Sequence, residues 1–137
     1  NIPFTHYTDI KRGKDFISAD GKTIIANSEL TLETGEPFSY AYCSDTMYDE
    51  RVIEAIRGVD LLYHEATFLH DRLKRAEETK HSTALQAGMV AKKAGVGKLI
   101  IGHFSSRYDV LDELLAETRS VFANSFIANE GEHFFSE

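Results

Sequence analysis

Short apolar runs alternate with amphipathic segments along most of this chain. Four runs of four to six residues, at 38–43, 59–63, 98–101 and 125–128, are rich in aromatic and aliphatic side chains, which is typical of buried strands. Between these runs, apolar residues recur three or four positions apart, as in helices with one buried face. The order strand, helix, strand, helix, strand, helix, strand predicts a layered α/β domain.

Capping residues mark the expected helix boundaries. Asp49 is a candidate N-cap for the first of these helices, and Asp109 is one for the last. Thr83 with Gln86 fits a capping box at the start of the middle helix, which Gly95 ends. The positions expected to face the core are Val52, Ile53, Ile56, Leu85, Met89, Val90, Leu111, Leu114, Leu115 and Phe122.

Other parts of the chain are less regular. Residues 7–14 are compatible with a short helix, and residues 15–27 with two strands joined at Asp20-Gly21, a favourable hairpin pair. Residues 68–80 are polar and aperiodic, which indicates a mobile loop. We expect a last short strand at 133–135, after a turn.

Composition narrows the class of protein. The 137 residues are 42% hydrophobic and 27% charged, which predicts one globular domain over residues 1–137. No apolar run approaches the roughly 20 residues that span a bilayer, so we expect no membrane partner. Cys43 is the only cysteine, which excludes an internal disulfide and favours a reducing compartment. We therefore expect a cytoplasmic protein with a buried free thiol.

The charge balance limits binding of nucleic acid. A net charge of −7 argues against broad electrostatic attraction of phosphates. One dense basic cluster stands out, and it consists of Arg72, Lys74, Arg75 and Lys80. The cluster is compatible either with a solvated loop or with a phosphate-contacting lip beside an active site.

Polar residues of one chemical kind follow the predicted strands. Asp45, the pair His64-Glu65 and His103 come at strand ends, and His81 comes just before a helix. Each has an ordinary interpretation, since Asp45 is compatible with a helix cap and His64 with a core histidine. Together they suit a metal site, because Asp and His are zinc ligands and a carboxylate such as Glu65 fixes a histidine tautomer.

Four motifs, in order along the chain, resemble ribonuclease Z, the metallo-β-lactamase-fold endonuclease that trims the 3′ end of precursor tRNA. They are Ser44-Asp45-Thr46, His64-Glu65-Ala66-Thr67, His81-Ser82-Thr83 and the run Gly102-His103-Phe104-Ser105-Ser106-Arg107-Tyr108. The resemblance implies that Asp45 bridges two zinc ions and that His103 is a terminal ligand of one. It implies that His81 donates a proton or stabilises the transition state, oriented by Glu65. Ser105 and Arg107 would hold phosphate.

The family's His-x-His-x-Asp-His cluster has no match in this sequence. The chain therefore resembles the carboxyl-terminal half of the family's αββα sandwich, which would be a mixed sheet with helices on one face. Such a half would leave an apolar sheet face open, with Tyr40, Tyr42, Leu62 and Ile100 as candidates for either face. We expect a homodimer that is inactive by itself.

Two alternatives remain open. One is another metallo-β-lactamase-fold phosphodiesterase with a different substrate. The other is a non-catalytic α/β interaction module that keeps these motifs as structure.

Overall fold

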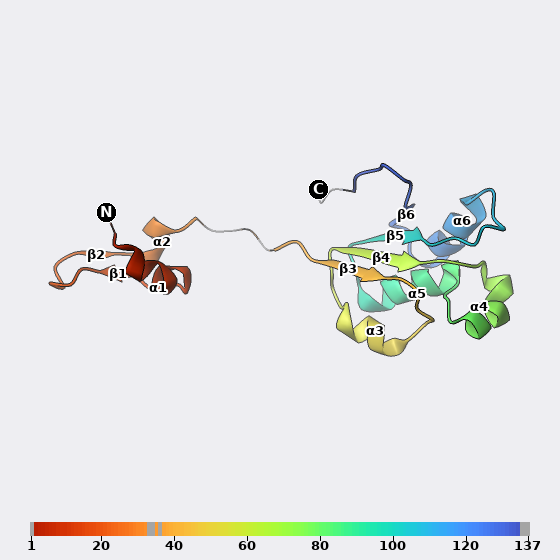
Figure 1. Ribbon diagram of the computed structural model, residues 1–137, viewed down its shortest axis with the longest axis horizontal. Helices are drawn as coiled ribbons and strands as arrows, with labels where there is room; N and C mark the ends of the chain where they lie inside the picture. Colours follow the sequence, from red (N-terminus) through yellow and green to blue (C-terminus); the bar gives the residue numbers. More distant parts are fainter. Residues whose placement is uncertain (1, 33–34, 36, 135–137) are drawn as a thin grey trace. The chain divides into compact units, whose positions relative to one another are not determined.

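The computed structural model describes residues 2–32, 35 and 37–134, and the chain falls into two compact units, Asn1–Pro37 and Phe38–Glu137 (Figure 1). The sequence was interpreted as one domain. The boundary coincides with the change of hydrophobic pattern near Pro37, so each unit is described by itself.

The first unit contains the expected helix and hairpin. A 3₁₀ turn, η1 (Phe4–His6), leads into α1 (Tyr7–Lys11), and β1 (Phe16–Ile17) pairs antiparallel with β2 (Ile24–Ile25). The turn between the strands contains Gly21 at φ +70°, a conformation that suits glycine. A short helix, α2 (Asn27–Leu30), follows.

The second unit has the predicted alternation of strands and helices. The elements after residue 38 are β3 (Tyr40–Cys43), α3 (Glu50–Ala55), β4 (Leu61–Glu65), η2 (His70–Arg72), α4 (Leu73–Thr79), α5 (Ala84–Ala94), β5 (Lys98–Gly102), α6 (Asp112–Val121) and β6 (Ser125–Ile127). The sheet order is β3-β4-β5-β6, and all three pairings are parallel. The expected α/β class is confirmed. Antiparallel pairing, expected within a mixed sheet, occurs instead between β1 and β2 in the first unit.

The register of the parallel strands decides which side chains face the helices. Leu62 lies opposite Leu99, and both are fully buried among residues of α3, α5 and α6. Residues one position away point to the other face, where Tyr40 and Tyr42 are 54% and 64% exposed. The helices α3, α5 and α6 therefore pack on one face of the sheet, as expected.

Helix α5 packs closely against α6. Thr83 and Gln86 form the predicted capping box, and Gly95 ends the helix. A Cβ atom at Gly88 would lie 2.8 Å from the carbonyl oxygen of Thr118, so a larger residue would push the helices apart. The buried face of α5 is mostly small, with Ala84, Ala87, Gly88, Val90, Ala91 and Ala94, whereas Leu85 and Met89 are only half-buried.

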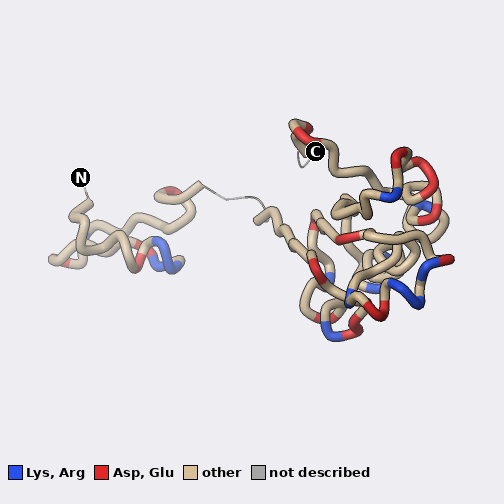
Figure 2. The backbone as a smooth tube through the Cα atoms, turned by 45° about the vertical axis from the view of Figure 1, so that its right-hand side comes forward, with Lys and Arg blue, Asp and Glu red and all other residues tan. Residues whose placement is uncertain are grey.

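The expectation of a loop at 68–80 was wrong, because this stretch contains η2 and α4. The sequence did not predict α4, because Ala76 is its only buried residue and the helix lacks a strong apolar period. The basic cluster lies here, interspersed with acidic residues (Figure 2). Arg75 contacts Glu78 at 3.4 Å, and Arg72 lies 3.8 Å from Asp71.

Two smaller expectations need correction. Helix α6 begins at Asp112, with Leu111 rather than Asp109 at its N-cap position. Asp112 and Glu113 in its first turn suit the positive end of the helix dipole. At 133–135, His133 and Phe134 lie outside any strand, and Phe135 lies outside the described residues.

Candidate metal and catalytic site

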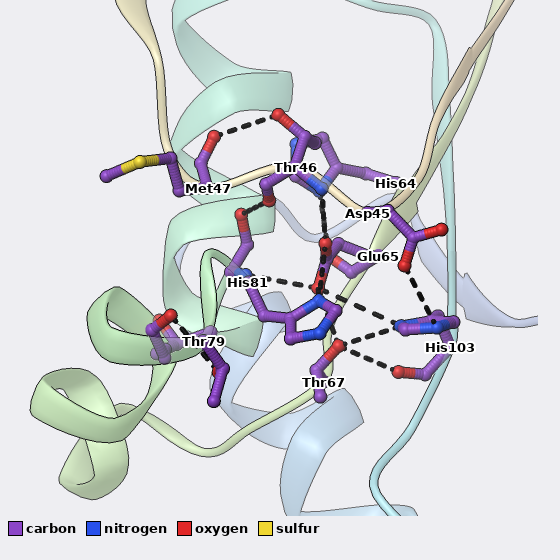
Figure 3. Close-up of polar contacts among 12 residues, drawn as sticks. Asp45, Thr46, Met47, His64, Glu65, Thr67, Thr79, His81 and His103 are labelled. Atoms are coloured by element: carbon purple, nitrogen blue, oxygen red, sulfur yellow. Dashed lines mark hydrogen bonds and ion pairs between the residues drawn. The ribbon is translucent and has the colours of Figure 1, made fainter.

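The candidate site lies at the carboxyl edge of the parallel sheet. Asp45 follows β3, Glu65 ends β4, and His103 follows β5, so parallel pairing brings them to one edge. His81 approaches the same edge from the connection between α4 and α5 (Figure 3). The convergence expected from the sequence is therefore present.

Asp45, His81 and His103 form a group of potential metal ligands. Each offers one ligand atom, and these atoms lie within 4.8 Å of one another. His103 Nε2 lies 3.3 Å from Asp45 Oδ1, and the two imidazole rings are 5.2 Å apart between centroids. One carboxylate and two imidazoles fit the donor preferences of zinc. The sequence interpretation assigned His81 to acid catalysis, and the geometry brings it into the same group.

Glu65 is a fully buried carboxylate with several donors. Its Oε1 accepts from the Thr46 backbone N–H at 2.5 Å, and its Oε2 accepts from the Ser82 backbone N–H at 3.1 Å. His81 Nδ1 lies 3.1 Å from both oxygens, and the Thr67 hydroxyl donates to Oε2 at 2.5 Å. These partners offset the cost of burying a charge, and the contact with Nδ1 leaves His81 Nε2 directed away from Glu65.

The backbone is strained at this site. Among the described residues, positive φ outside glycine occurs at Asp45 (48°), Lys80 (65°) and His103 (58°). Two of these are candidate ligands, and the third precedes His81. Left-handed conformations cost energy for residues with a Cβ, and such strain clusters at functional sites.

The candidate phosphate contacts, Ser105 and Arg107, lie on the loop after His103. Arg107 Nε donates to Ser105 Oγ at 3.0 Å, and its guanidinium lies 5.1 Å from the Phe68 ring centroid. Phe68 in turn meets His81 edge-on, at 6.4 Å between centroids. Arg107 is exposed, and Phe68 contacts both its guanidinium and the His81 ring.

His64 is a core histidine, the ordinary alternative weighed from the sequence. It is 1% exposed, and its Nδ1 donates to the backbone oxygen of Glu65 at 2.7 Å. Burial lowers the pKa of His64 below 6.5, while the hydrogen bond to Glu65 and the charge of that residue act against the shift.

Three polar residues of the site were missed as site residues from the sequence: Thr46, Thr67 and Ser82. The Ser82 hydroxyl donates to the Thr46 backbone oxygen at 2.6 Å, which ties the loop after β3 to the start of α5. Thr67 contacts both Glu65 and His103. Their signal in the sequence was that all three lie inside the quoted motifs, within two residues of Asp45, Glu65 or His81.

Comparisons with known proteins add evidence from outside the chain. No protein-family model matches the chain. Ribonuclease Z from Bacteroides fragilis (strain YCH46) is 46% identical over 129 residues, which is 94% of this chain and 42% of that protein. The chain thus spans less than half the length of the curated relatives it matches.

Two solved structures share its fold. The metallo-β-lactamase fold protein YhfI from Bacillus subtilis superposes with a TM-score of 0.61 at 33% identity, over 66% of this chain and 37% of YhfI. A long-form RNase Z from yeast gives a TM-score of 0.52 at 33% identity, over 64% of this chain and 12% of that protein. Among the described residues, no helix has both the length and the apolarity to cross a membrane. The match to ribonuclease Z and the two similar structures show that the chain is a relative of ribonuclease Z that matches part of that protein. Its fold is part of the metallo-β-lactamase fold.

Proposed function

We propose that this chain supplies part of the catalytic centre of a zinc-dependent endoribonuclease that removes the 3′ trailer from precursor tRNA. The observation that carries the proposal is the grouping of Asp45, His81 and His103 at one sheet edge around the buried Glu65. The sequence relationship to ribonuclease Z supports this substrate class. The same grouping favours an enzyme over a module that keeps the motifs only as structure.

In the proposed mechanism, Asp45 and His103 would hold the zinc. Bound zinc would supply a water of lowered pKa and positive charge for the attacking and leaving oxygens. His81 donates a proton from Nε2 to the leaving oxygen, because its Nδ1 faces Glu65 at 3.1 Å. Glu65 orients the imidazole and stabilises its charged form. Further ligands would come from outside this chain, so we expect the chain to be inactive by itself.

Ser105 and Arg107 are proposed to bind the phosphate next to the scissile bond. The contact between Arg107 Nε and Ser105 Oγ positions the guanidinium, whose planar donors suit phosphate oxygens. The packing of Arg107 on Phe68, which also contacts His81, would hold the phosphate near the proton donor.

The decisive experiment uses the complete enzyme that contains this chain. Purified enzyme is incubated with a 5′-labelled precursor tRNA and zinc, and the products are separated by length. We expect one cut at the 3′ end of the mature tRNA, and none by the 137-residue chain alone. Cleavage by the chain alone would contradict the assignment of further ligands to another segment.

A second candidate function is hydrolysis of another phosphodiester. The fold shared with YhfI leaves this candidate open, because a fold by itself does not fix the substrate. A small chromogenic phosphodiester, assayed beside precursor tRNA, separates the two. Rapid turnover of the small substrate with an intact tRNA would favour the second candidate.

Two further expectations belong to this proposal. The exposed Tyr40 and Tyr42, on the sheet face opposite α3, α5 and α6, support a homodimer that buries this face. Light scattering coupled to size exclusion of the chain tests it, and a monomer would contradict it.

Cys43, the single free cysteine, is compatible with the proposed cytoplasmic location.

A further inference from the structure

We propose that Thr67 is a positioning residue that sets which nitrogen of His103 carries the proton and so directs the other nitrogen toward Asp45. The inference rests on the proposed function, since it concerns a histidine proposed to hold metal. Thr67 lies two residues beyond Glu65, where the chain leaves β4, and it is 6% exposed. It touches no proposed substrate group and acts through its neighbours.

The Thr67 hydroxyl lies between a buried carboxylate and the imidazole. Its oxygen is 2.5 Å from Glu65 Oε2, 3.0 Å from His103 Nδ1 and 2.9 Å from the His103 backbone oxygen (Figure 3). The direct distance from His103 Nδ1 to Glu65 Oε2 is 4.0 Å, which is too long for a hydrogen bond. The hydroxyl therefore bridges two groups that do not reach each other.

The donors and acceptors favour one assignment. A hydroxyl has a single proton to donate, and both Glu65 Oε2 and the His103 carbonyl can only accept. The carboxylate is charged and closer, so it receives the Thr67 proton. Nδ1 of His103 must then be the donor to the Thr67 oxygen. The proton sits on Nδ1, and Nε2 keeps its lone pair.

The competing tautomer has weaker support. In that tautomer His103 Nε2 would donate to Asp45 Oδ1 at 3.3 Å, and the Asp45 side chain is 75% exposed. Nδ1 would then need the Thr67 proton, which would deprive Glu65 Oε2 of its short contact. The buried bridge through Thr67 outweighs the exposed contact with Asp45, because hydrogen bonds to a desolvated charge are stronger.

One carboxylate thus orders both histidines of the site. Glu65 meets His81 Nδ1 directly at 3.1 Å and meets His103 Nδ1 through Thr67. In both imidazoles the Nε2 lone pair is left for a metal, or, once protonated, for donation. Fixing a ligand's tautomer in this way raises metal affinity, and losing such a partner costs about 10–100-fold.

The test is nitrogen NMR of the metal-free chain with ¹⁵N-labelled histidine at alkaline pH. Wild type should show His103 protonated on Nδ1, with the signal assigned by its loss in His103→Gln. Thr67→Val, which lacks the hydroxyl, should shift His103 toward the Nε2-protonated form, and Thr67→Ser should keep the wild-type pattern. The matched control is Thr118→Val, which removes another buried hydroxyl, one bonded to Ala84 and Leu114.

Two results would overturn the inference: a wild-type His103 protonated on Nε2, or a Thr67→Val spectrum identical to wild type. If Thr67→Val does not fold, the wild-type tautomer alone decides. Zinc titration of the same samples gives a second readout, with binding about 10–100-fold weaker in Thr67→Val and restored in Thr67→Ser. A wild-type chain with the expected tautomer, together with a complete enzyme that leaves precursor tRNA intact, would count against the proposed function and leave the Thr67 assignment standing.

Discussion

Lys80 and Gly95 end two successive helices, α4 and α5, in nearly the same left-handed conformation. Lys80 has φ 65° and ψ 35°, and Gly95 has φ 67° and ψ 39°. Glycine adopts this conformation without strain, whereas a residue with a Cβ pays about 1–2 kcal/mol. Lys80 directly precedes His81, so the strained residue adjoins the candidate site.

Replacing Lys80 with glycine should stabilise the protein. Glycine removes the left-handed strain of Lys80 in the folded state, but it loses more conformational entropy on folding. The first effect is larger, so we expect the free energy of unfolding to rise by about 0.5–1 kcal/mol. The matched reverse change, Gly95→Ala, should destabilise by about 1 kcal/mol, since nothing lies within 4 Å of the added Cβ and only backbone strain acts. Urea denaturation measures both, and equal signs for the two variants would contradict the argument.

Variants of the candidate ligands should separate metal binding from catalysis in the complete enzyme. Asp45→Ala and His103→Ala should lose both bound metal and cleavage. His81→Ala should retain metal and lose about 10²–10⁴-fold in rate, as expected for a general acid. Metal analysis with single-turnover cleavage of precursor tRNA distinguishes these outcomes. Full metal occupancy in both ligand variants would refute the assignment of Asp45 and His103.

The buried His64 should make stability depend on pH. Burial lowers its pKa in the folded state below 6.5, so the unfolded chain binds a proton first as pH falls. The contribution of His64 to the free energy of unfolding should therefore be constant above about pH 6.5. Below that pH it should fall by up to about 1.4 kcal/mol per pH unit, until the folded-state pKa is reached.

Asparagine at position 64 is the matched variant, because its amide can donate to the Glu65 backbone oxygen as Nδ1 does. Urea denaturation between about pH 5 and 7.5 should show a shallower pH dependence in His64→Asn than in wild type. An identical slope in the two proteins would show that His64 titrates alike in the folded and unfolded chain.

The start of the 68–80 segment should resist hydrogen exchange, contrary to the expectation from its polar sequence. The Leu69 backbone N–H donates to the Tyr108 hydroxyl at 3.0 Å, and the His70 backbone N–H donates to the Glu117 carboxylate at 3.0 Å. Tyr108→Phe removes one acceptor, so exchange at Leu69 should rise by up to about tenfold while His70 changes little. Fast exchange at both amides in wild type would restore the mobile-loop interpretation.

The sequence by itself determined the order of the four strands of the parallel sheet and of helices α3, α5 and α6, and several of their boundaries. Asp49 accepts from the Arg51 backbone N–H at the start of α3, and the capping box of Thr83 and Gln86 opens α5. Such caps involve residues two or three positions apart, so a local pattern is enough to find them. The motifs around Asp45, Glu65, His81 and His103 also carried the relationship to ribonuclease Z.

Only the tertiary structure decided which residues act together. Whether Leu62 or Tyr42 faces the helices depends on strand register, which joins residues about 20 to 40 positions apart and leaves no local signal. The helix α4 was missed because Ala76 is its only buried residue, which leaves no apolar period in the sequence to detect. The role of Thr67 could not be predicted from the sequence either, because its hydroxyl contacts His103, which lies 36 positions later in the chain.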